Sequence, residues 1–281
     1  MSRVTSGIAM ASMVTLGSAS SPCFGDDLLG IHFDTGAVYR ISTTDASVTL
    51  LGSTGIEHFA GIDFGPDGLL YGFTAGEASV PVLYSINPAN GFAATPIGPL
   101  GGQFIFEGSL VFAPDGRLLG VSHDGEKNPQ LFTVNTSTGA ATLIGTISAG
   151  FHDVNGLAWR SDGMLVGLDR VTNSLLAINP TTAASSIIAV LDPVVGAVGG
   201  MAVVEDTAYF STSGPGLPSP GTNGLYHFDL FTGEIDPVGS LGPEIMGTGI
   251  SGLAVPEPAS LIILLCGATA GLMYHRSLRR R

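Results

Sequence analysis

The residues of this sequence that could do chemistry are carboxylate, imidazole and amide side chains that lie between apolar runs. Carboxylates and imidazoles ligate divalent cations, and the same polar groups can hydrogen-bond to sugars. They therefore suggest a cation or sugar site, with ordinary solvated loop residues as the competing interpretation. The candidates are His32, Glu57, His58, Glu107, His123, Asp124, His152, Asp153, Asn155, Asp169 and Arg170.

Motifs for particular reactions are missing from the sequence. It contains no Gly-x-Ser-x-Gly, Walker, His-Glu-x-x-His or Cys-x-x-Cys motif, and no Asp-x-Asp-x-Asp-Gly calcium loop. No catalytic residue is assigned, and no cofactor is indicated beyond a divalent cation. The sequence thus favours a protein that is not an enzyme.

A repeated pattern between residues 26 and 255 must position the candidates. Its spacing of about 40 to 50 residues is typical of propeller blades. We expect Trp159, which ends one of the repeated first strands, to pack in the core. The first strands read Ile62-Asp63-Phe64, Leu110-Val111-Phe112, Leu157-Ala158-Trp159, Met201-Ala202-Val203 and Leu253-Ala254-Val255.

Two kinds of turn punctuate the repeat. Three first strands end at an Asp-Gly pair, which predicts a hairpin because Gly tolerates positive φ and Asp bonds to its local backbone. A second turn joins the third and fourth strands and occurs five times, which predicts five blades. The Asp-Gly pairs are residues 67–68, 115–116 and 162–163, and the second turns are residues 42–46, 87–91, 135–139, 179–183 and 229–233.

The two ends of the repeat region are both incomplete. The first copy begins at its second strand, residues 27–31, and the last copy stops after its first strand, residues 252–255. Pairing these two strands would complete one blade and leave no open sheet edge. We therefore predict an all-β, five-bladed β-propeller over residues 26–255, closed by its N- and C-terminal strands.

This arrangement predicts which face binds a ligand. If the first strands line the channel, Val255 leaves on the face of the Asp-Gly turns. The opposite face carries the longer loops and the polar candidates, and loops on a rigid scaffold are the usual place for recognition.

The charge of the repeat region limits its expected binding partners, and its cysteine content excludes a disulfide within it. Residues 26–255 carry five basic and 22 acidic residues, a formal charge of −17, which would repel a phosphate backbone. Nucleic acid is therefore not an expected partner. Cys23 and Cys266 are the only cysteines, so the repeat region contains no disulfide.

Both ends of the chain carry predicted address segments. Residues 1–25, with Arg3 before the apolar run 8–19, predict a signal peptide cleaved before Asp26 or near residues 19–20. The apolar run 259–274 predicts one transmembrane helix. The basic end, residues 275–281, would stay cytoplasmic and leave the repeat region outside the membrane.

The C-terminus resembles the PEP-CTERM tail of exosortase substrates. The resemblance covers residues 256–281 and rests on Pro256-Glu257-Pro258 (motif 255–260), the short apolar helix and the arginine-rich end. It implies that the export machinery and an exosortase-type sorting protease are partners. It also implies processing near the motif and a final place at the cell surface or in an exopolysaccharide-rich matrix. An ordinary C-terminal anchor is the alternative.

The repeats also resemble propeller ectodomains that precede such tails and, more loosely, NHL and lactonase propellers. A lactonase-like site needs Glu, Asn and Asp just before the first strands, where only Asn155 is a suitable ligand. The sequence therefore favours an exported binding or structural module for exopolysaccharide or a surface protein. A divergent metal-dependent hydrolase and a passive spacer are the alternatives.

Overall fold

The computed structural model describes residues 27–75, 80–101, 108–122, 129–148, 150–191, 197–204, 206–213, 223–245 and 247–256. The predicted signal peptide, Glu257, Pro258, the apolar run 259–274 and the basic end lie outside these residues. Within them, no helix is long and apolar enough to cross a membrane.

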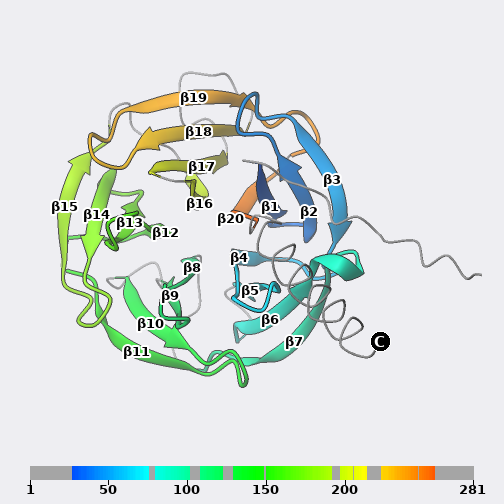
Figure 1. Cartoon of the computed structure of the whole chain (residues 1–281), viewed down its shortest axis with the longest axis horizontal. Helices are drawn as coiled ribbons and strands as arrows, with labels where there is room; N and C mark the ends of the chain where they lie inside the picture. Colours follow the sequence, from blue (N-terminus) through cyan, green and yellow to red (C-terminus); the bar gives the residue numbers. More distant parts are fainter. Residues whose placement is uncertain are drawn as a thin grey trace, which may run out of the picture.

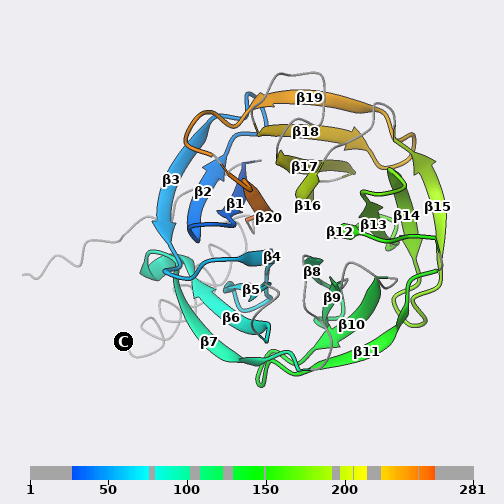
Figure 2. The same cartoon turned by 180° about the vertical axis from the view of Figure 1, so that it is seen from behind.

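The described strands form five four-stranded antiparallel sheets, arranged as blades around a central axis (Figure 1, Figure 2). The predicted five-bladed, all-β propeller is thereby confirmed. Blade 1 contains β20 (Ile250–Ala254), β1 (Leu28–His32), β2 (Ala37–Ile41) and β3 (Val48–Ser53); blade 2 contains β4 (Phe59–Phe64), β5 (Leu70–Thr74), β6 (Val82–Asn87) and β7 (Ala93–Pro99), with the 3-10 turn η1 (Pro88–Asn90) between the last two. Blade 3 contains β8 (Gly108–Phe112), β9 (Leu118–Ser122), β10 (Gln130–Val134) and β11 (Ala141–Thr146); blade 4 contains β12 (Val154–Trp159), β13 (Leu165–Asp169), β14 (Ser174–Ile178) and β15 (Ser185–Val190); blade 5 contains β16 (Ala197–Val204), β17 (Thr207–Ser213), β18 (Gly224–Asp229) and β19 (Ile235–Ser240).

The Asp-Gly turns have the predicted local chemistry. The Asp67 carboxylate accepts a hydrogen bond from the Leu69 amide at 3.1 Å, and Gly68 has a φ of 77°. In blades 3 and 4, Asp115 accepts the same kind of bond from the Arg117 amide and Asp162 accepts it from the Met164 amide. Turn formation therefore accounts for these aspartates, and the turns place the ends of the first strands on one face.

The ring is closed by the two ends of the repeat region, as predicted. β20 pairs with β1 in antiparallel register, with Leu29 opposite Ala254. The Asp34 carboxylate also accepts a hydrogen bond from the Thr248 amide at 3.1 Å, which ties the segment before β20 to blade 1. Closure thus depends on contacts between residues more than 200 positions apart.

The hydrophobic core lies in layers between neighbouring blades. In the layer between blades 4 and 5, Val166 and Leu168 pack against Phe210 and Phe228, and all four are fully buried. Burying one such side chain stabilises the fold by roughly 1.5–3 kcal/mol. Since each blade is covered on both faces, its inner strands are almost continuously apolar.

A β-bulge between the third and fourth strands bends the outer strand of every described blade. The outer strands consequently run around the circumference and reach the next blade (Figure 1). In blade 2, a Cβ on Gly98 would lie 2.2 Å from the Thr138 carbonyl oxygen of blade 3. Glycine at this position allows the outer strand to approach the neighbouring turn, which keeps the ring tight.

Candidate functional site at the mouth of the central channel

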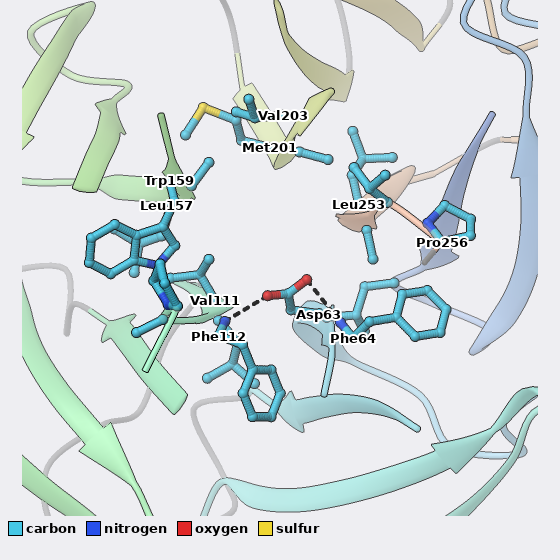
Figure 3. Close-up of a pocket in the computed structure, with 18 of the residues that line it drawn as sticks. Asp63, Phe64, Val111, Phe112, Leu157, Trp159, Met201, Val203, Leu253 and Pro256 are labelled. Carbon is cyan, nitrogen blue, oxygen red and sulfur yellow. Dashed lines mark hydrogen bonds between the residues drawn. The ribbon is translucent and has the colours of Figure 1, made fainter. Parts of the chain in front are cut away.

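A cavity of about 410 Å³ opens at the end of the central channel, on the face of the Asp-Gly turns (Figure 3). Its walls come from the first strands of all five described blades and from two of the Asp-Gly turns. The volume lies in the range of small-molecule sites, roughly 300–1,000 Å³. The last wall residue of each first strand is Phe64, Phe112, Trp159, Val203 or Val255.

The cavity has an aromatic half and an aliphatic half. Blades 2, 3 and 4 contribute Phe64, Phe112 and Trp159, whereas blades 5 and 1 contribute Val203 and Val255 at the equivalent positions. The repeat places these residues on equivalent sites, but their types differ. The cavity is therefore asymmetric although the scaffold is not.

Asp63 is the only charged residue among the described residues that line the cavity. Its carboxylate accepts one hydrogen bond from the Phe64 amide at 2.8 Å and another from the Phe112 amide at 2.6 Å. The second bond joins blade 2 to blade 3. Figure 3 shows the carboxylate at the cavity wall between the two phenylalanines. Asp63 therefore connects two blades and also places a carboxyl group at the cavity wall.

Phe112 is held in place by Tyr71 of β5. The two rings meet edge to face with centroids 5.3 Å apart, and the Tyr71 hydroxyl donates to the Asp67 carboxylate at 2.8 Å. Burial, the hydrogen bond to Asp67 and the Asp67 charge together raise the pKa of Tyr71 to about 12. The hydroxyl thus stays protonated and fixes the ring that supports Phe112.

Trp159 is half-buried and lines the cavity, while part of its ring also packs against the core layer between blades 3 and 4. The prediction of a core tryptophan therefore describes only part of its environment. Its indole N–H is buried and makes no hydrogen bond to any described residue. Because Trp159 is the sole tryptophan of the chain, tryptophan fluorescence reports on this one side chain, at the cavity wall and the adjoining core layer.

Pro256, the first residue of the predicted sorting motif, is buried and lines the same cavity as Val255. The chain consequently leaves the propeller on the Asp-Gly face, in agreement with the predicted exit. Glu257 and Pro258 lie outside the described residues.

The rim of this face carries an excess of acidic groups. The Asp115 carboxylate pairs with Arg117 at 2.8 Å, and Asp162 pairs with Arg160, whose hydrogen bond lowers the pKa of Asp162. Asp206 accepts hydrogen bonds from Ser161 across blades 4 and 5. Together with Asp63 and Asp67, these residues give the described part of the face more negative than positive charge.

On the opposite face, the structure places the blade 4 candidates in a buried polar network. Asp169 is completely buried, and its carboxylate accepts bonds from the His152 and Asp153 amides and from the amide and hydroxyl of Thr172. Asp153, also buried, forms an ion pair with Arg170. These bonds join the loop before β12 to the loop after β13, which is a structural use of the carboxylates.

The other predicted ligand-face residues are divided among several places. His32 is buried and its Nδ1 accepts the Asp34 amide at 3.2 Å, whereas Glu57 and His58 are exposed, with the His58 ring 5.0 Å from that of Phe33. In blade 4, the His152 side chain is exposed and Asn155 is buried. Glu107, His123 and Asp124 lie outside the described residues.

The structure brings Asp153 and Asp169 together but keeps His32, Glu57 and His58 on blades 1 and 2. Within the described ranges, no group of three or more His, Cys, Asp or Glu side chains could hold a metal ion. The binding role predicted for this face stays a prediction, since several of its loops lie outside those ranges.

Apart from Pro256 of the sorting motif, the residues that build the cavity were not among the predicted site residues. Asp63, Phe64 and Phe112 look like ordinary strand residues when each copy of the repeat is considered alone. A signal does exist, because Asp63 occupies a position where the other copies have Val111, Ala158, Ala202 and Ala254. A charge at a repeat position that is otherwise apolar marks a place where one blade differs from the rest.

The comparisons with known proteins agree with the fold. No protein-family model matches the sequence, and no curated protein matches it significantly. A chain in the crystal structure of a nidogen/laminin complex has 13% sequence identity and a TM-score of 0.55, and the match covers 83% of this chain and 99% of that one. A structural-genomics protein of unknown function from Bacteroides thetaiotaomicron VPI-5482 has 14% identity and a TM-score of 0.55, with 84% and 72% coverage. At these identities the similarity concerns the propeller fold alone.

Proposed function

We propose that the protein is an exported β-propeller that acts as a binding module, with its ligand site in the mouth of the central channel on the Asp-Gly face. The observation that supports this proposal is the 410 Å³ cavity to which every described blade contributes a wall. The cavity lies where the central channel of a propeller opens, and concave sites of this size are the usual places where small ligands bind. Because the surrounding strands belong to a closed ring, the site is formed before a ligand arrives.

A chain with a similar fold occurs in a nidogen/laminin complex, so the architecture is compatible with binding. In the exported setting that we propose here, the ligand would come from exopolysaccharide or from another surface protein.

Titration of the full-length protein with 1-naphthylmethanol, a neutral aromatic probe, tests the binding site. We expect saturable heat in calorimetry and a parallel change in Trp159 emission. The double variant Val203→Phe/Val255→Phe extends the aromatic residues of the other blades into the aliphatic half, and we expect it to abolish binding. Val190→Phe makes the same change on the exposed outer strand β15 and is the matched control. Absence of binding, or equal binding by the double variant, would overturn the proposed site.

Export and sorting form the second part of the proposal. The support is the pair of address segments in the sequence, together with the exit of the chain at Pro256 on one face of the propeller. Intact-mass measurement in a bacterium with an exosortase-type system tests it. We expect loss of residues 1–25 and shortening near Pro256-Glu257-Pro258, with no shortening in Glu257→Ala. A mature protein that keeps residues 259–281 would instead be an ordinary membrane-anchored protein.

A further inference from the structure

We propose that the membrane covers the mouth of the central channel while the protein is anchored, and that the mouth opens only when the chain is cut after Pro256. This inference rests on the export and sorting proposed above and adds a state of the protein in which its ligand site is closed. Two features support it: the place where the chain leaves the propeller, and the short connection from that place to the predicted membrane helix.

The chain leaves the propeller from the wall of the cavity itself. Ala254 ends the strand that closes the ring. Val255 is half-buried and packs against the core layer between blades 5 and 1, and Pro256 is buried and lines the mouth. Figure 3 shows Pro256 at the cavity wall near Leu253. The last described residues are therefore part of the ring and add no length to the connection.

The connection from Pro256 to the membrane is short. Only Glu257 and Pro258 separate Pro256 from the apolar run 259–274. Three residue steps span at most about 11 Å in an extended chain. A helix over this run would be about 24 Å long, whereas the hydrocarbon core is about 30 Å thick, so flanking residues must complete the span and shorten the free connection further. The Asp-Gly face is consequently held against the headgroups.

This geometry has opposite consequences for the two faces. On the Asp-Gly face, a polysaccharide chain or a protein would have to enter between the headgroups and the cavity, in a gap no wider than the connection permits. The loop-bearing face, with exposed Glu57 and His152, points away from the membrane. A ligand of the channel mouth therefore binds the released protein, whereas a partner of the loop-bearing face can bind both forms.

The charge of the rim indicates that the connection, and not attraction, keeps this face at the membrane. The described rim has more acidic than basic residues. They are Asp67, Asp115, Asp162 and Asp206 against Arg117 and Arg160. Such a surface gains nothing from zwitterionic headgroups and is repelled by anionic ones. Lengthening the connection should therefore be sufficient to uncover the mouth.

The test compares the full-length chain with a variant in which about 20 Gly and Ser residues, with an average reach of roughly 25 Å, are inserted between Pro256 and Glu257. Both chains are reconstituted into phosphatidylcholine nanodiscs that carry a quencher on a fraction of the headgroups. Trp159, the sole tryptophan, lies at the mouth and reports its distance from those headgroups. We expect its emission to be quenched in the full-length chain and to recover in the linker variant.

A tryptophan on the opposite face is the matched control. In Trp159→Phe/Glu57→Trp the reporter moves to an exposed residue of the loop-bearing face. Phenylalanine is the residue that blades 2 and 3 carry at the position equivalent to Trp159, so we expect the ring to accept it. The headgroup quencher should leave the emission of this variant unchanged, with or without the linker.

Access to the mouth is measured separately with a maleimide attached to a large polymer. Pro114→Cys places a thiol on an exposed residue of the mouth, and Glu57→Cys places one on the loop-bearing face. Both also carry Cys23→Ser and Cys266→Ser, which remove the native thiols. We expect the polymer to label Glu57→Cys in either chain and Pro114→Cys only when the linker is present. A small maleimide should label both variants in both chains, because it fits the gap.

The outcomes separate this inference from the proposed function. Equal Trp159 emission in the two chains, or equal polymer labelling of Pro114→Cys, would overturn the closed state and leave the binding site standing, because naphthylmethanol tests that site independently. A chain that does not stay in the nanodiscs would overturn the membrane anchor and this inference together. If naphthylmethanol does not bind, the binding site fails, while Trp159 quenching still decides whether the membrane covers the mouth.

Discussion

The two faces of the propeller use polar and apolar residues in opposite ways. On the loop-bearing face, Asp169 and Asp153 are buried and bonded to loop amides and to Arg170. On the Asp-Gly face, the first strands of all five described blades line an open cavity, and their aromatic residues Phe64, Phe112 and Trp159 also pack between the blades. Polar residues near loops can therefore hold the loops together, while residues with core-like character can line an open cavity.

The largest effect on stability is expected from Asp169→Ala on the loop-bearing face. The change leaves the His152, Asp153 and Thr172 donors without their acceptor in a buried place, so we expect the free energy of unfolding to fall by about 3 kcal/mol. Urea unfolding measures this loss. Asp162→Ala, on an exposed turn of the other face, is the control and should leave the free energy of unfolding nearly unchanged. If Asp169→Ala were as stable as the wild type but no longer bound a ligand from the cell envelope, Asp169 would have a binding role and not a structural one.

An intermediate effect is expected at Tyr71 on the Asp-Gly face. Its folded pKa of about 12 lies above the ordinary value of 10.0, so its contribution to stability is complete below pH 10 and is lost as pH rises toward 12. Trp159 emission followed from pH 9 upward should show loosening of the cavity in this window. In Tyr71→Phe the transition should move to higher pH, because no phenol has to ionise. An unchanged transition would mean that Tyr71 does not support the cavity.

The smallest effect should come from Asp34, which joins the loop-bearing face to the closing strand. Burial alone would raise the pKa of Asp34. The hydrogen bonds from Thr248 and the nearby charges of His32 and His58 lower it by more, so the pKa lies below the ordinary value of 3.8. Its contribution is therefore present above pH 3.8 and is lost as pH falls through the lower folded value.

Asp34→Ala should lower the free energy of unfolding by about 1 kcal/mol or less. It should also speed hydrogen exchange at the Thr248 amide. Asp45→Ala, in an exposed turn of the same blade, is the control because the bonds of Asp45 to Ser42 and Ser47 stay within that turn. Equal exchange in both variants would show that Asp34 does not hold the closing segment.

Most of the architecture was predictable from the sequence because its causes are local. The Asp-Gly pairs form the hairpins they predict, and residues such as Ala46 and Ala183 adopt positive φ at the ends of the second turns. The incomplete first and last copies predicted the pairing of β20 with β1. The candidate site was much less predictable, since polar residues such as Asp169 look the same in a sequence whether they bind a ligand or a loop amide.

The number of blades, the turns and the mode of closure could all be predicted from the sequence, because each follows from a pattern within one repeat or from the incomplete copies at its ends. The position of the cavity became clear only from the folded arrangement of the blades. That cavity depends on how closely strands tens of residues apart approach one another around the axis. It also depends on contacts such as the bond from the Phe112 amide to Asp63, 49 residues away, which no local pattern encodes.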